Sequence, residues 1–122
     1  MDLKLFNSEL KIMNVLWSRG DTLAKDLVKI LRDEIGWNKS TTYTMISRCI
    51  NKGIIANIGD NFTCHALIGK DEVQKFETNE LIQNMFDGSA DKLIATMIDG
   101  QYKISEDEVE KLKEYIKNLE NK

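Results

Sequence analysis

Apolar side chains recur every three to four residues in three successive stretches of the N-terminal half, which is the spacing of amphipathic helices. Each stretch begins at or directly after a residue that caps helices well and ends before a glycine. The predicted helices are 7–19 with Asn7 or Ser8 as N-cap, 22–35 with Thr22 as N-cap, and 39–52 with Asn38 as N-cap.

The pattern of apolar residues changes after Gly53. Two short runs that favour β-structure, 54–58 and 62–67, flank the cluster Gly59-Asp60-Asn61, and this arrangement predicts a β-hairpin. Three helices followed by a hairpin is the element order of a winged helix-turn-helix domain. We therefore expect a mainly α fold with a small β-hairpin over residues 1–70.

Residues 71–122 are predicted to form three further amphipathic helices, which begin near Asp71, Ser89 and Ser105. Ser105 and Glu108 have the spacing of a capping box. Helices of about fifty residues in total are poorly placed to build a core alone, so we expect them to form a dimerisation region. Packing of these helices against the N-terminal domain of the same chain is the alternative. The candidate dimerisation residues are Val73, Phe76, Met85, Leu93, Met97, Leu112 and Ile116.

The two faces of the third predicted helix differ in chemistry. The inward stripe is Thr42, Met45, Ile46, Cys49 and Ile50. The outward face holds hydroxyl and amide side chains with one arginine and no acid, and such groups can bind phosphates and base edges in a DNA groove. An ordinary threonine-rich surface helix is the alternative interpretation. The candidate DNA-binding residues are Ser40, Thr41, Tyr43, Thr44, Ser47 and Arg48, and Asn51 shares their face.

The charge distribution agrees with a nucleic-acid partner near this helix. The 122-residue chain has a net charge of −3, yet no acidic residue occurs between Glu34 and Asp60, where Lys39, Arg48 and Lys52 lie. Residues 73–122 carry seven lysines and eleven acidic residues, so the negative charge is concentrated in the C-terminal part.

Several classes of function are disfavoured by the composition. One histidine and two cysteines cannot supply the four ligands of a structural zinc site, and no catalytic motif occurs, so we expect no catalytic residues, metal or cofactor. The absence of a long apolar run and of signal-peptide features predicts a cytoplasmic protein with reduced thiols and no membrane partner. Cys49 is expected in the core, while a redox-sensing Cys64 is an alternative. Cys64 and His65 should point to opposite faces of their strand.

Two segments resemble a known family. Glu9-x-x-Ile12-Met13-x-x-Leu16-Trp17 is similar to the opening helix of the penicillinase and methicillin-resistance repressors (BlaI/MecI type, with copper-responsive CopY repressors as relatives). The segment 36–53, from Gly36-Trp37-Asn38 through Arg48 to Lys52-Gly53, resembles the recognition-helix signature of that family. The second segment is specific, and weaker resemblance extends over most of the chain.

The resemblance implies a homodimeric transcriptional repressor of antibiotic-resistance genes of the β-lactamase type. Its expected partners are an inverted-repeat DNA operator with TACA/TGTA-like half-sites and a second copy of the chain, and a regulatory protease is a further candidate. By the same resemblance, DNA contacts fall on Ser40, Thr41, Tyr43, Thr44 and Arg48, while Ser47 is added from its place on the outward face. A winged-helix adaptor that binds proteins and not DNA is the alternative function.

The chain also departs from the family pattern. The family often carries Lys or Arg at the positions of Ser40 and Tyr43, and its hairpin is commonly basic, whereas Gly59-Asp60-Asn61 is acidic. The stretch 93–98 lacks the Asn-Phe pair at which penicillinase repressors are cleaved. The C-terminal tail lacks the Cys-x-Cys cluster of the copper-responsive relatives, so neither familiar switch is visible.

Overall fold

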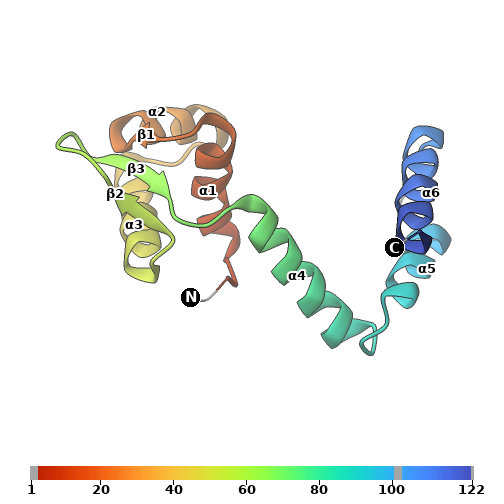
Figure 1. Cartoon of the computed structure of the whole chain (residues 1–122). Helices are drawn as coiled ribbons and strands as arrows, with labels where there is room; N and C mark the ends of the chain where they lie inside the picture. Colours follow the sequence, from red (N-terminus) through yellow and green to blue (C-terminus); the bar gives the residue numbers. More distant parts are fainter. Residues whose placement is uncertain (1–2, 101–102, 122) are drawn as a thin grey trace. The chain divides into compact units, whose positions relative to one another are not determined.

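The computed structural model describes residues 3–100 and 103–121 and divides into two compact units, Met1–Asn79 and Glu80–Lys122. The division lies inside the fourth helix, later than the boundary expected at residue 70. The first unit contains α1 (Asn7–Arg19), β1 (Thr22–Leu23), α2 (Ala24–Ile35), α3 (Lys39–Lys52), β2 (Ile55–Asn57), β3 (Thr63–Ala66) and the start of α4 (Lys70–Met85) (Figure 1). The second contains the end of α4, α5 (Ala90–Asp99) and α6 (Glu106–Glu120). The fold is therefore mainly α with a small antiparallel sheet, as expected for a winged helix followed by further helices.

The sheet has one strand more than the predicted hairpin. Its order is β1-β3-β2, and both pairings are antiparallel. Thr22, expected to cap the second helix, lies instead in β1 opposite Cys64, and α2 begins at Ala24 after Leu23 as N-cap residue. A two-residue strand has no periodicity of its own, and it forms only because β3 offers a free edge to pair with.

The core of the first unit is built mainly from the inner faces of α1, α2 and α3, and side chains of the sheet and of the start of α4 complete it. Burial of each aliphatic side chain contributes about 1.5–3 kcal/mol, so this cluster holds the helices together. The central members are Ile12 and Met13 of α1, Leu27 and Leu31 of α2, and Ile46 and Cys49 of α3, all at most 2% exposed. The indole Nε1 of Trp17 donates to the carbonyl of Ile68 at 2.9 Å, which fixes α1 to the segment after β3.

Helices α3 and α6 begin with the side-chain caps that the sequence predicts, and the starts of α1, α2 and α4 differ from the prediction. The Asn38 carboxamide accepts from the backbone N–H of Thr41, and Ser105 forms the expected capping box with Glu108. At α1 the N-cap residue is Phe6, not Asn7 or Ser8, because the carboxylate of Glu9 reaches back to the Phe6 N–H at 2.7 Å. Asp71 lies inside the first turn of α4, and Ser89 occupies the N-cap position of α5 without a side-chain bond to the backbone.

Candidate nucleic-acid interface

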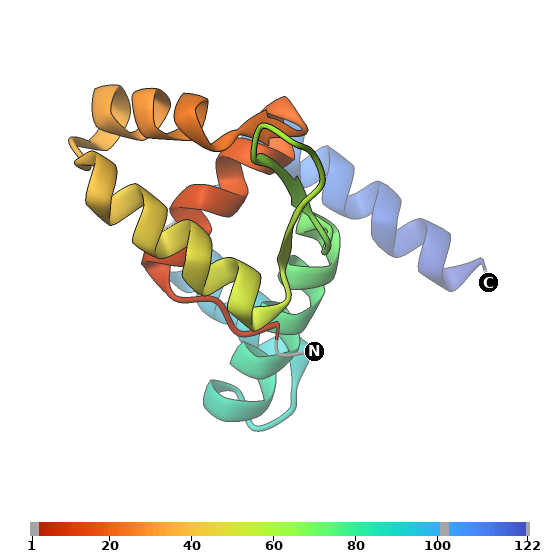
Figure 2. The ribbon, with the colours of Figure 1, turned by 90° about the vertical axis from the view of Figure 1, so that its left-hand side faces the viewer.

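Helix α3 is held at both ends by residues whose types suit those positions. Asn38 caps its N-terminus, and Gly53, at φ +86°, ends it in the left-handed conformation that glycine adopts without strain. Figure 2 shows α3 running across the face of the first unit that is turned toward the viewer. One side of this helix is therefore packed on the core, and the opposite side lies on the surface.

The inner side of α3 matches the predicted stripe. Thr42, Ile46 and Cys49 are completely buried, while Met45 and Ile50 are half-buried at the margins. The Thr42 hydroxyl oxygen is buried without a hydrogen-bond partner. Burial, followed by the negative charge of Glu9, raises the pKa of the Cys49 thiol to about 12, so this sulfur is a protonated core group at neutral pH.

The outer side of α3 forms an open hollow of about 560 Å³, and all of its lining comes from this one helix. Of the six predicted DNA-binding residues, the structure brings five together there. Thr41 is half-buried beside the N-cap and does not line the hollow. The lining residues are Ser40, Tyr43, Thr44, Ser47, Arg48 and Asn51. Asn51 was on the predicted face but outside the predicted contact set, and its helical spacing from Ser47 and Arg48 is the signal that marks it.

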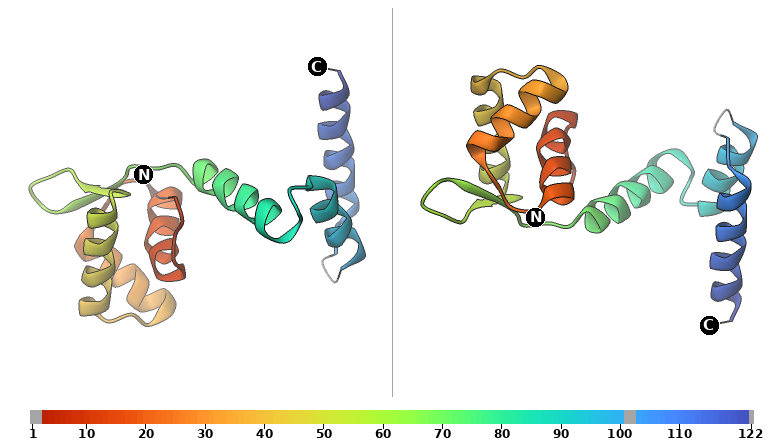
Figure 3. Two further views of the ribbon diagram at one scale, coloured as in Figure 1. Left: turned by 90° about the horizontal axis from the view of Figure 1, so that it is seen from below. Right: turned by 90° about the horizontal axis from the view of Figure 1, so that it is seen from above.

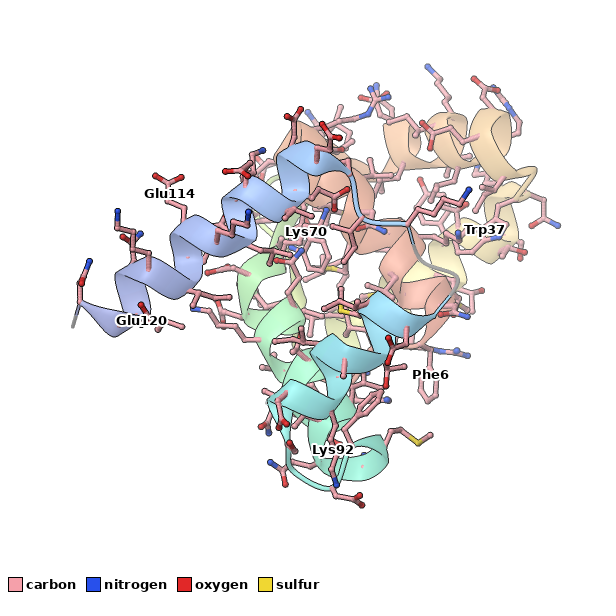
Figure 4. All side chains as sticks on the ribbon, turned by 90° about the vertical axis from the view of Figure 1, so that its right-hand side faces the viewer. Phe6, Trp37, Lys70, Lys92, Glu114 and Glu120 are labelled. Atoms are coloured by element: carbon pink, nitrogen blue, oxygen red, sulfur yellow. The ribbon has the colours of Figure 1, made fainter. Side chains whose placement is uncertain are left out.

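The charge of Lys52 is paired inside the first unit, although in the sequence it is one of the basic residues that favour a nucleic-acid partner. Its ammonium group lies 3.0 Å from the carboxylate of Glu9, a side chain that is only 1% exposed, and it also contacts the carbonyl of Lys4. The same group sits 5.4 Å from the centroid of the Phe6 ring, which Figure 4 labels at the start of α1. Lys52 therefore ties the C-terminus of α3 to α1, and Arg48 is the cation among the six residues of the hollow.

The hairpin next to α3 carries little positive charge. Both views in Figure 3 show the loop between β2 and β3 extending away from α1, α2 and α3. Asp60 is exposed in this loop, and Ile58 is 53% exposed. The imidazole of His65 lies 2.7 Å from the carboxylate of Asp21, and this pair connects β3 to the segment before β1.

The two neighbours Cys64 and His65 lie on opposite sides of β3, as their alternation predicts. Cys64 is fully buried and His65 is partly exposed. Burial raises the pKa of the Cys64 thiol to about 11, which disfavours the reactive thiolate that a redox sensor requires. Within residues 3–100 and 103–121, no group of three His, Cys, Asp or Glu side chains is placed to hold a metal ion.

The second unit exposes apolar side chains on all its helices. No residue that the structure describes between 80 and 121 is buried, and Met85, Ile98 and Ile116 are 71%, 65% and 54% exposed. A hollow of about 250 Å³ between α5 and α6 is lined mainly by Met97, Ile104, Leu112 and Tyr115, with Glu108 and Lys111 beside them. Figure 4 shows charged side chains, Glu114 among them, projecting from α6.

The predicted dimerisation residues therefore differ in how far they are exposed. Met85, Met97, Leu112 and Ile116 are exposed, and Leu93 is half-buried. Val73 is 5% exposed and belongs to the core cluster of the first unit, so it is not available to a second copy. Phe76, one turn later in α4, is half-buried.

Comparisons of the sequence with known proteins identify its relatives. Residues 5–118 match the model of the family described as "Penicillinase repressor". The methicillin resistance regulatory proteins MecI of Mammaliicoccus sciuri and of Staphylococcus aureus (strain N315) are each 24% identical over 118 residues, which cover 93% of this chain and 95% of theirs. A 16.5 kDa protein from the ptsI 3′ region of Latilactobacillus sakei is 26% identical over 98 residues, covering 79% of this chain and 67% of that protein. None of the described helices is long and apolar enough to cross a membrane. The chain belongs to the penicillinase repressor family, which is a family of transcriptional repressors.

Proposed function

We propose that this protein represses transcription by binding, as a homodimer, to an inverted-repeat operator of resistance genes with TACA/TGTA-like half-sites. The observation that carries the proposal is the outer face of α3, where six polar side chains line one open hollow and none of them is acidic. A major groove of B-DNA admits an α-helix, and its base edges present acceptors and donors that such side chains can bind.

The residues of the hollow suit different parts of a DNA site. The guanidinium of Arg48 can bind the O6 and N7 acceptors of a guanine with two parallel hydrogen bonds. Hydroxyl groups such as those of Ser40 and Thr44 bind phosphates or base edges, and they position the helix without adding charge. Because Lys52 is paired with Glu9, we expect few phosphate contacts and therefore a shallow dependence of affinity on salt.

The homodimer is supported by the composition of the second unit. Its described residues form no buried core, although α5 and α6 carry apolar side chains at helical spacing. A unit of this size gains stability when such faces pack against another copy, and a twofold dimer presents two copies of α3 to two half-sites. Occupation of the operator by the dimer would block access to the promoter.

The names of the relatives support the choice of target genes, since the MecI proteins are described as methicillin resistance regulators.

The experiment that tests the proposed function is a fluorescence-anisotropy titration at two salt concentrations. It compares a duplex that carries the inverted repeat with a duplex of the same bases in scrambled order. We expect a preference of at least about a hundredfold for the repeat. Binding to neither duplex at low salt would contradict the proposal and favour a protein-binding adaptor.

The Arg48→Ala variant tests whether the outer side of α3 contacts DNA bases. We expect it to weaken specific binding by about 1–3 kcal/mol, because a bidentate base contact is lost. Arg32→Ala is the matched control, because it removes the same charge at a position outside the hollow. Arg32 lies exposed on α2, where it pairs with Asp33. If both variants bind with the same affinity, Arg48 makes no base contact.

A further inference from the structure

Phe62 has a backbone conformation that is unusual for an aromatic residue. Its φ is +57°, and among the described residues other than glycine only Asp87 shares a positive φ. Bulky side chains adopt the left-handed region only where their surroundings hold them there, and such positions cluster at functional sites.

Two elements hold the backbone of Phe62. Its carbonyl accepts a hydrogen bond of 2.9 Å from the N–H of Ala24, the first residue of α2. Its own N–H donates to the carbonyl of Gly59 at 3.3 Å, which closes the turn of the hairpin. Thr63, the next residue, pairs with Leu23 of β1. Phe62 is thus fixed where the hairpin loop meets the start of α2.

The ring of Phe62 contacts the outer side of α3. Its centroid lies 6.1 Å from that of the Tyr43 ring, and the two ring planes are tilted by 59°. This centroid separation lies in the range of favourable contacts between aromatic rings, and the geometry is tilted. Both residues are half-buried, and Tyr43 lines the hollow together with Ser40 and Thr44.

We propose that Phe62 is a positioning residue for DNA recognition, which holds the Tyr43 ring in the orientation that brings its phenol to the DNA. The inference rests on the proposed function. A tyrosine without a neighbour on a helix surface loses rotamer freedom when it binds, whereas a ring already supported has lost that freedom during folding. The hydroxyl of Tyr43 then contributes to affinity only while an aromatic ring occupies position 62.

A double-mutant cycle on the full chain tests this dependence. Tyr43→Phe removes the hydroxyl and keeps the ring, while Phe62→Gly removes the supporting ring and suits the positive φ. We expect Tyr43→Phe to weaken binding to the inverted repeat about fivefold in the wild-type background, the effect of one hydrogen bond. In the Phe62→Gly background, the same change should weaken binding by less than about twofold. Phe62→Tyr, which keeps a ring, should preserve the fivefold effect.

The controls separate positioning from a general loss of structure. Phe62→Leu keeps apolar volume without a ring, so it serves as the second variant if Phe62→Gly does not fold, as judged by urea unfolding. A purely structural role for Phe62 predicts equal loss of affinity for the repeat and the scrambled duplex, with the Tyr43→Phe effect unchanged. That result overturns the inference, and so does the absence of any Tyr43→Phe effect in the wild type. Failure of the wild type to prefer the repeat would instead overturn the proposed function itself.

Discussion

The pair between Glu9 and Lys52 allows a quantitative prediction about stability. Glu9 is 1% exposed and accepts from Lys52 and from the Phe6 N–H, while the Lys52 side chain is 15% exposed. Lys52→Met replaces the lysine with an unbranched apolar side chain that is one heavy atom shorter and has no charge, which leaves the carboxylate of Glu9 buried with the Phe6 N–H as its remaining donor. Breaking a buried pair in this way costs about 3–5 kcal/mol, and the remaining bond from Phe6 places the expected cost near the lower limit, at about 3 kcal/mol.

The assay is urea unfolding followed by tryptophan fluorescence. Both tryptophans of the chain, Trp17 and Trp37, lie in the first unit, so the signal reports the unit that contains the pair. With an m-value of about 1.5 kcal/mol/M, a loss of about 3 kcal/mol lowers the urea midpoint by about 2 M. The corresponding decrease in melting temperature is roughly 12–24 °C for a unit of this size.

Two further variants test the physical reason for the loss. In Glu9→Gln/Lys52→Met no charge remains in the buried site, so we expect this double variant to be more stable than Lys52→Met alone. Arg19→Met is the matched control, because the pair of Arg19 with Glu34 is exposed on both sides and should change stability by less than about 0.5 kcal/mol. A Lys52→Met protein within about 1 kcal/mol of the wild type, or a double variant no more stable than the single, would refute the reasoning.

Three more predictions concern the core and the second unit. Thr42→Val should change the free energy of unfolding by less than about 1 kcal/mol in the urea assay, because the buried hydroxyl has no partner; a loss of more than about 2 kcal/mol would reveal a bond to it. Burial raises the pKa values of Cys49 and Cys64 from 9.0 to about 12 and about 11, so their contribution to stability is present below pH 9.0 and decreases as pH rises toward those values. Urea midpoints measured between pH 8 and pH 10.5 should therefore fall in the wild type and fall less in Cys49→Ala, and equal slopes would contradict the assignment. Leu112→Asp should convert the proposed dimer to a monomer in sedimentation experiments, because it places an unpaired charge in the apolar face of α6; a variant that still sediments as a dimer would show that this face packs elsewhere.

Local sequence determined most of the helical structure of this protein. The cap at Asn38, the glycine at position 53 and the capping box at Ser105 act over four or five residues, so their effect is readable from the chain alone. The division of α3 into an inner and an outer face also follows from its 3.6-residue period, and the structure places five of the six predicted contact residues around one hollow.

Contacts between distant segments decided the features that local patterns could not determine. Thr22 lies in a strand because it pairs with Cys64 of β3. Lys52 donates to the carboxylate of Glu9, which is 43 positions away in the sequence. The contact of Phe62 with Tyr43 depends on how the hairpin packs against α3. Val73 is buried in the core of the first unit, although its spacing matched that of the later helices. Periodicity reports which face of an element is apolar, but the partner that covers the face, and the charge that neutralises a buried group, depend on the tertiary arrangement.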